Sequence, residues 1–142
     1  MTIPDANILL YAYNADSPQH SRSAAWVEDL FSGTEGVGLA WVTIWAFLRI
    51  STNSRVWPNP KSSSQALEIV KSWLKQPDVV AVHPGERHIE LLEGLVTRYG
   101  VSGPLMSDAG LAAIALEHGA VLASTDQDFR RFPELKWVNP LE

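Results

Sequence analysis

Apolar and polar positions follow two recurring patterns along this chain. Short, densely apolar runs predict strands, and they lie at residues 3–5, 37–39, 79–82, 121–123 and 136–138. Apolar positions spaced three or four apart predict helices at residues 8–13, 17–32, 42–50, 62–74, 86–99 and 108–118. The run at 79–82 has no polar face, which favours a strand that is covered on both sides.

Strands separated by helices predict an α/β fold. We expect a three-layer sandwich with a central, mostly parallel sheet of about five strands and helices on both faces. The 142 residues fit one domain, residues 1–142, and the chain shows no internal repeat or linker. In parallel sheets, functional sites form beyond the carboxyl ends of the strands, near the point where the winding reverses. The residues that follow each strand are therefore the candidates for chemistry.

Aspartates stand at several of these places. Asp5 ends the first strand, Asp126 and Asp128 follow the fourth strand, and Asp108 opens the sixth helix. Each has an ordinary structural explanation, because aspartate caps helices and stabilises turns. Capping does not require acids to gather at one edge of a sheet, yet this order of elements points at least three of them there. Carboxylates packed closely together repel each other unless they hold a proton or share a cation.

Composition and motifs narrow the chemistry. The chain has no cysteine, so a metal site would use oxygen or imidazole ligands. Carboxylates suit a hard divalent cation, Mg²⁺ or Mn²⁺. No G-x-S-x-G nucleophile motif, no G-x-x-x-x-G-K phosphate loop and no H-E-x-x-H zinc motif occurs. These observations favour hydrolysis by an activated water at an aspartate-held metal over covalent catalysis.

The net charge of the chain limits the kind of partner that it can bind. A net charge of −5, from 11 basic and 16 acidic residues, is unfavourable for a protein that binds phosphates. Without the four aspartates the balance would be 11 against 12, and a bound dication would offset part of their charge. The start of the chain does not resemble a signal peptide, and no apolar run reaches the roughly 18 residues of a membrane span. We therefore expect a cytoplasmic protein with no membrane partner.

Four segments resemble the PIN-domain ribonucleases, specifically the VapC-type toxins of bacterial toxin–antitoxin modules. They are residues 3–7 (IPDAN), 47–52 (FLRIST), 107–115 (SDAGLAAIA) and 124–129 (STDQDF). The last two segments, in this order and spacing, are the most specific. The resemblance extends over nearly the whole chain and implies a PIN-like fold.

The resemblance also implies a divalent-metal-dependent endoribonuclease, the toxin component of a type II toxin–antitoxin system. The catalytic acids would be Asp5, Asp108, Asp126 and Asp128, of which the first three would hold Mg²⁺ or Mn²⁺. Asn7 and Thr125 would orient those carboxylates by hydrogen bonds. The implied partners are an RNA substrate, a cognate VapB-like antitoxin and a second copy in a homodimer.

Three arginines are candidates for substrate binding. Arg130 and Arg131 follow the acidic segment directly, and Arg49 lies in the third helix, close to Arg55 and Trp57 of the adjacent loop. Arginine can bind a phosphate through two parallel hydrogen bonds. A solvated helix end explains Arg130 and Arg131 equally well, so both interpretations stay open.

The third helix departs from the family pattern. The family usually carries a glutamate shortly before the position of Arg49, whereas residues 41–46 (WVTIWA) contain no acid. This difference leaves an alternative function open, a catalytically impaired PIN-like module that binds RNA or a protein. Aspartyl-phosphate phosphatases and receiver domains also place an aspartate after the first strand. They fit less well, because Asn7 and His83 stand where those proteins carry further aspartates.

Overall fold

The computed structural model describes all residues from 1 to 142 and contains the expected alternation of strands and helices. In chain order the elements are β1 (Thr2–Pro4), α1 (Ala6–Ala12), α2 (His20–Ser32), β2 (Val37–Ala40), α3 (Trp41–Ser51), α4 (Ser63–Leu74), β3 (Val79–Val82), α5 (His88–Tyr99), α6 (Leu105–Glu117), β4 (Val121–Ala123), the 3-10 helix η1 (Gln127–Arg131) and β5 (Trp137–Val138). None of the helices is long and apolar enough to span a bilayer.

The five strands form one sheet in the order β3-β2-β1-β4-β5, and every neighbouring pair is parallel. The chain builds outward from β1 to β2 and β3, then crosses back to place β4 and β5 on the other side. The winding direction therefore reverses between β1 and β4. Their register pairs Pro4 with Ala123, so Asp5 and Ser124 emerge side by side at the carboxyl end of the sheet.

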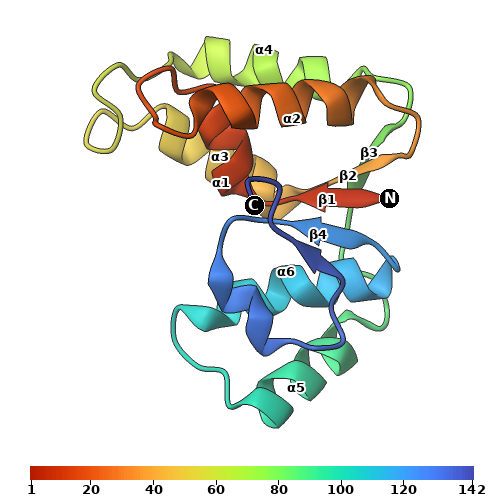
Figure 1. Cartoon of the computed structure of the whole chain (residues 1–142). Coiled ribbons are helices and arrows are strands. Elements are labelled where there is room, and N and C mark those ends of the chain that lie inside the picture. Colours follow the sequence, from red (N-terminus) through yellow and green to blue (C-terminus); the bar gives the residue numbers. More distant parts are fainter.

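Helices cover both faces of this sheet (Figure 1). Helices α1 to α4 pack on one face around a core that includes Ile8, Leu39 and Phe47. Helices α5 and α6, together with η1, pack on the other face around Ile3, Leu122 and further apolar residues. The three-layer α/β class expected from the sequence is confirmed, and the sheet is entirely parallel.

Two helix starts differ from the expectation by three residues. Helix α6 begins at Leu105, so Asp108 lies in its first turn and does not cap it. Pro104 precedes the helix with a φ of −59°, a value that is already helical, which lets the helix start earlier than the acid suggested. Helix α2 begins at His20, because Ser17 makes a local turn in which its hydroxyl accepts from the backbone N–H of Gln19.

The burial expected for β3 was wrong. This strand pairs only with β2 and forms an edge of the sheet, where Val80 is 53% exposed. An apolar run shows that a strand has few polar side chains. Whether helices cover that strand depends on its place in the order of the strands. The fully buried strand is β2, which lies between β1 and β3.

Candidate functional site

The site is centred on the ends of β1 and β4, where the winding reverses. Asp5 directly follows β1 and caps α1, because its Oδ1 accepts the N–H of Ala6 at 2.8 Å while its own N–H donates to the carbonyl of Ala123. One side chain thus ends a strand and starts a helix. This double role fixes the direction of the carboxylate.

Ser124 joins the residues that follow the two strands, and it is completely buried. Its hydroxyl donates to Oδ2 of Asp5 at 2.7 Å and accepts the backbone N–H of Asp126 at 3.0 Å. It also accepts from the side-chain amide of Asn7 at 3.4 Å. The hydroxyl that reaches Asp5 therefore belongs to Ser124 and not to its neighbour Thr125.

Two further acids come from the turn after β4. Asp126 caps η1, and its side chain accepts the backbone N–H of Asp128 at 2.9 Å. Capping and clustering thus coexist, because one oxygen of Asp126 serves the helix and the other remains free to bind a ligand. Asp128 is exposed, whereas Asp126 is half-buried.

Helix α6 brings in the remaining acid. Carboxylate oxygens of Asp108, Asp126 and Asp128 all lie within 4.8 Å of one another. Asp5 is not part of this tight group, although its charge and that of Asp126 act on Asp108. The structure therefore gathers all four predicted acids at one edge, but the closest three include Asp128 in the place where the sequence analysis expected Asp5.

Burial and repulsion perturb two of these carboxyl groups. Burial, and then repulsion from Asp126 and the other two aspartates, raises the pKa of Asp108 to about 6, and Arg131 opposes part of this rise. Burial also raises the pKa of Asp5, against the hydrogen bonds that it accepts. Raised carboxyl pKa values mark a place where the protein itself does not balance the negative charge.

These residues fit a divalent cation. Three carboxylates with mutually close oxygens form a hard, all-oxygen ligand set of the type that Mg²⁺ and Mn²⁺ prefer. The buried Oδ1 of Asn7 has no hydrogen-bond partner in the protein, so it leaves an acceptor beside the acids unused. An uncompensated negative site with a spare acceptor favours a bound cation with its waters.

A cleft of about 220 Å³ lies between the acids and α3. Its walls are formed by Asp5, Ala6, Val42, Thr43, Ala46, Arg49, Ser107, Asp108 and Leu111. The α3 wall consists of Val42, Thr43, Ala46 and Arg49, so it brings one guanidinium and no carboxylate. Residues 41–46 contain no acid, and three of them line the cleft. The cleft therefore has no carboxylate on its α3 side.

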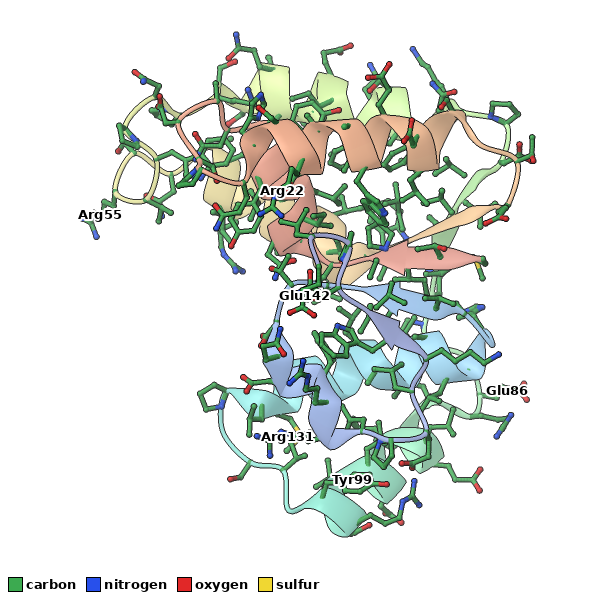
Figure 2. All side chains as sticks on the ribbon, in the orientation of Figure 1. Arg22, Arg55, Glu86, Tyr99, Arg131 and Glu142 are labelled. Carbon is green, nitrogen blue, oxygen red and sulfur yellow. The ribbon has the colours of Figure 1, made fainter.

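The predicted substrate-binding arginines lie in different surroundings. Arg49 lines the cleft, and the charge of Arg131, labelled in Figure 2, reaches Asp108. Arg130 lies over the ring of Trp137 at 5.6 Å. Arg55 points outward from its loop in Figure 2.

Trp57 cannot serve as an open stacking surface, because it is only 7% exposed.

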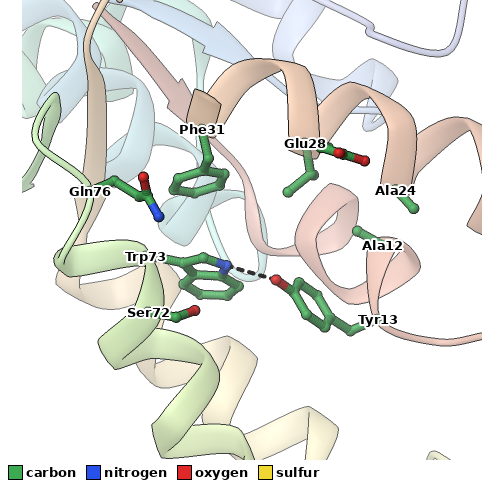
Figure 3. Close-up of a pocket in the computed structure, with 9 residues that line it drawn as sticks. Ala12, Tyr13, Ala24, Glu28, Phe31, Ser72, Trp73 and Gln76 are labelled. Carbon is green, nitrogen blue, oxygen red and sulfur yellow. Dashed lines mark hydrogen bonds between the residues drawn. The ribbon is translucent and has the colours of Figure 1, made fainter. Parts of the chain in front are cut away.

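A separate cavity of about 320 Å³ lies among α1, α2 and α4 (Figure 3). Phe31 stacks on Trp73 there, and the indole N–H of Trp73 donates to the hydroxyl of Tyr13 at 3.0 Å. None of the predicted site residues lines it. This cavity belongs to the packing of the helical layer and is not part of the acidic site.

Comparison with known proteins decides the family. The family model described as the PIN domain matches residues 2–135. The chain belongs to the PIN-domain family. Curated relatives cover this PIN domain almost completely. Ribonuclease VapC33 of Mycobacterium tuberculosis is 41% identical over 141 residues, which is 99% of both chains. Ribonuclease VapC37 of the same organism is 41% identical over 99% of this chain and 97% of its own.

Solved structures of PIN domains share the fold. VapBC-1 from nontypeable Haemophilus influenzae superposes with a TM-score of 0.71 at 16% identity, covering 99% of this chain and 98% of that chain. Mycobacterium tuberculosis VapC20, described as a sarcin-ricin loop cleaving toxin, gives 0.68 at 14% identity over 96% and 98%. At these identities the likeness establishes the fold of the PIN domain alone.

The sequence analysis missed Ser124, which was read as part of a motif without a role of its own. The register offered a signal, because Ser124 follows β4 at the position where Asp5 follows β1. A hydroxyl paired across two central strands with an acid can orient that acid. The order of the strands had to be known before this pairing could be recognised.

The raised pKa of Asp108 predicts how the stability of the metal-free protein depends on pH. The folded state holds this proton up to about pH 6, whereas the unfolded chain releases it near 3.8, so this group lowers the free energy of unfolding as the pH rises between the two values. Asp108→Asn removes that cost. We expect the variant to be about 1 kcal/mol more stable than the parent at pH 7 and to have only a small advantage at pH 4.

Thermal melts in EDTA at the two pH values measure this difference. Asp29→Asn is the matched control, because it makes the same chemical change on an exposed surface of α2. An advantage of Asp108→Asn that is equal at pH 4 and pH 7 would contradict the assigned pKa.

Proposed function

We propose that this protein is a divalent-metal-dependent endoribonuclease and the toxin of a type II toxin–antitoxin system, acting as a single domain over residues 1–142. The observation that carries the proposal is the group of three carboxylates from α6 and η1, whose oxygens lie within 4.8 Å of one another at the switch point of a parallel sheet. Relatives that are 41% identical over nearly the full chain carry the name ribonuclease, which supports the reaction class.

The acids divide into two roles. Asp108, Asp126 and Asp128 would hold the cation, because they form the tight group. Asp5 would join them through the cation or its waters, and it is kept in place by Ser124 and the N–H of Ala6. When bound, Mg²⁺ or Mn²⁺ supplies positive charge to the scissile phosphate and lowers the pKa of water at the site.

Other residues of the chain would position the substrate. Arg49 lies on the α3 wall of the cleft and Arg131 near Asp108, so their guanidinium groups could bind phosphates on either side of the acids. Arg130 would act from its position over Trp137. Asn7 would orient Asp5 through Ser124, to whose hydroxyl its side-chain amide donates. Thr125, to which the sequence analysis gave the same role, would contribute less than Ser124.

The proposed partners are RNA, a VapB-like antitoxin and a second copy of the chain. Structures described as VapBC, from Rickettsia felis and Haemophilus influenzae, have the fold of this chain with TM-scores of 0.70 and 0.71. That likeness supports an antitoxin as the partner that silences the nuclease. Because the net charge of −5 is unfavourable for binding phosphates, the RNA contacts would be confined to a few arginines near the acids.

A second candidate function is a PIN domain that binds RNA without cutting it. The observation in its favour is the α3 wall of the cleft, where Thr43, Ala46 and Arg49 supply no acid. A site with fewer carboxylates has fewer ligands for a second cation. The two functions differ in whether RNA is cleaved when a divalent cation is added.

The deciding experiment incubates the purified protein with total bacterial RNA and Mn²⁺ or Mg²⁺, with and without EDTA, and maps the new ends by sequencing. We expect discrete cleavage that EDTA abolishes and that Asp5→Ala lacks. Stable RNA binding without new ends at any cation concentration would overturn the nuclease proposal and establish the binding module.

A further inference from the structure

The cleft beside the acids continues into a second hollow of about 550 Å³. Both are bounded by α3 and α6, and Val42 lines both of them. On α6 the wall passes from Asp108 and Leu111 in the cleft to Ile114 in the second hollow. The two hollows are thus successive parts of one groove between α3 and α6, which we call the α3–α6 groove.

The far part of the groove is aromatic. Its lining consists of Trp41, Val42, Trp45, His83, Pro84 and Ile114. Trp45 is 63% exposed, so a large apolar surface is in contact with water, which is unfavourable. Its ring lies 6.4 Å from that of Trp41, whose other neighbour is the imidazole of His83 at 6.2 Å. Trp41 is therefore supported on two sides, whereas Trp45 presents a free face.

The groove has a direction. On α3 the two parts use neighbouring faces of the helix: Val42, Thr43, Ala46 and Arg49 line the cleft, and Trp41, Val42 and Trp45 line the aromatic part. From Asp108 to Ile114, α6 advances by about 9 Å. An extended strand that lies in the groove would therefore pass a cation, the acids and the aromatic rings within a span of a few nucleotides.

We propose that an unpaired base of the RNA substrate stacks on Trp45 while the adjoining phosphate lies at the acidic cluster. This inference rests on the proposed ribonuclease function and adds to it a base-binding subsite. Single-stranded RNA is commonly held by stacking its bases on aromatic side chains, which tolerates every base because each has a π face. The cleft itself offers acids, aliphatic side chains and one arginine but no ring, so the aromatic end supplies the stacking surface that the cleft lacks.

The size of the aromatic part favours a base over a protein partner. Its volume of about 550 Å³ lies in the range of pockets that bind a single small ligand. It is also hollowed and shares the wall residue Val42 with the acidic cleft. A base whose adjoining phosphate lies at the acids would fit such a hollow. The wall that the hollow shares with the acidic cleft is therefore the reason for proposing RNA as its occupant.

The test compares Trp45→Ala with Trp45→Phe and with Ile89→Ala. Phenylalanine keeps a stacking ring, and Ile89 is an apolar residue on α5 that is 72% exposed and outside the groove. Steady-state cleavage of a defined single-stranded RNA should show a KM about tenfold higher for Trp45→Ala, the size expected for one lost stacking contact. The kcat should change less than twofold, and both other variants should remain within twofold of the parent.

An abasic scan makes the test independent of turnover. Fluorescence anisotropy measures binding of RNA oligonucleotides that lack one base at a time, with Asp108→Asn as the non-cleaving background. One abasic position should weaken binding about tenfold in that background and should have no further effect when Trp45→Ala is added. This loss of additivity is the signature of a direct contact between the ring and that base.

Each outcome decides the question. If every abasic position weakens binding equally with and without Trp45, the stacking proposal is overturned. If Trp45→Ala changes the molar mass measured by light scattering, the ring belongs to an interface between copies and the proposal is also overturned. If the parent protein neither cleaves nor binds RNA with Mn²⁺, the proposed function fails first, and the subsite fails with it.

Discussion

Asp108→Asn is expected to reduce metal-dependent RNA cleavage about a thousandfold. Asp108 is the only member of the tight carboxylate group that comes from α6, so its loss leaves only the two acids of the η1 turn. Stabilisation of the reaction by a metal is worth several kcal/mol, and each 1.36 kcal/mol corresponds to a factor of ten in rate. Initial rates on a fluorogenic RNA at saturating Mn²⁺ measure the effect.

The control is again Asp29→Asn, which makes the same change of charge on α2 and should cleave at the parent rate. Far-UV circular dichroism should show that the fold of Asp108→Asn is intact. The change removes a carboxyl group whose charge is unfavourable in the folded state, as its raised pKa indicates. A rate within tenfold of the parent would show that Asp108 is not a metal ligand.

Ser124→Ala is expected to reduce cleavage by about ten- to a hundredfold. The hydroxyl of Ser124 contacts Asp5, Asn7 and the N–H of Asp126, so its removal frees groups on both central strands. Losing a hydrogen-bond partner that orients metal-binding carboxylates typically costs a factor of this size in affinity or activity. The midpoint of the Mn²⁺ dependence of the rate should rise together with the loss of activity.

Thr125→Ala is the matched comparison, because it removes the neighbouring hydroxyl. The structure places the hydroxyl of Ser124 on Asp5, so Thr125→Ala should stay within about threefold of the parent. A larger loss in Thr125→Ala than in Ser124→Ala would return the orienting role to Thr125, where the sequence analysis had placed it. Thermal melts of both variants separate a loss of orientation from a loss of folding.

Most of the fold could be predicted from local pattern. The alternation of apolar runs and helical periods gave the α/β class and the order of the elements, because each period reflects local geometry of the backbone. Burial of β3 and the start of α6 could not be read in this way. The first depends on which strand lies at the edge of the sheet, and the second on Pro104, whose fixed φ starts the helix before Asp108.

The site was partly predictable for the same reason. Asp5 and Asp126 follow strands, so a parallel sheet sends both to one edge. Asp128 belongs in the tight group because the backbone turns at the start of η1 and brings it back toward Asp126. The position of its carboxylate therefore depends on the path of the backbone over three residues. The groove between α3 and α6 joins helices more than fifty residues apart in sequence, so no local pattern could have indicated it.

The sequence by itself determined the class of fold, the positions of the acids along the chain and the absence of a carboxylate from residues 41–46. Only the tertiary structure decided which acids lie closest, which serine orients them and where an exposed tryptophan lies relative to them. The physical reason is that strand and helix propensities act over a few neighbouring residues. Distances across a site are set by strand order and helix packing, which depend on the whole core.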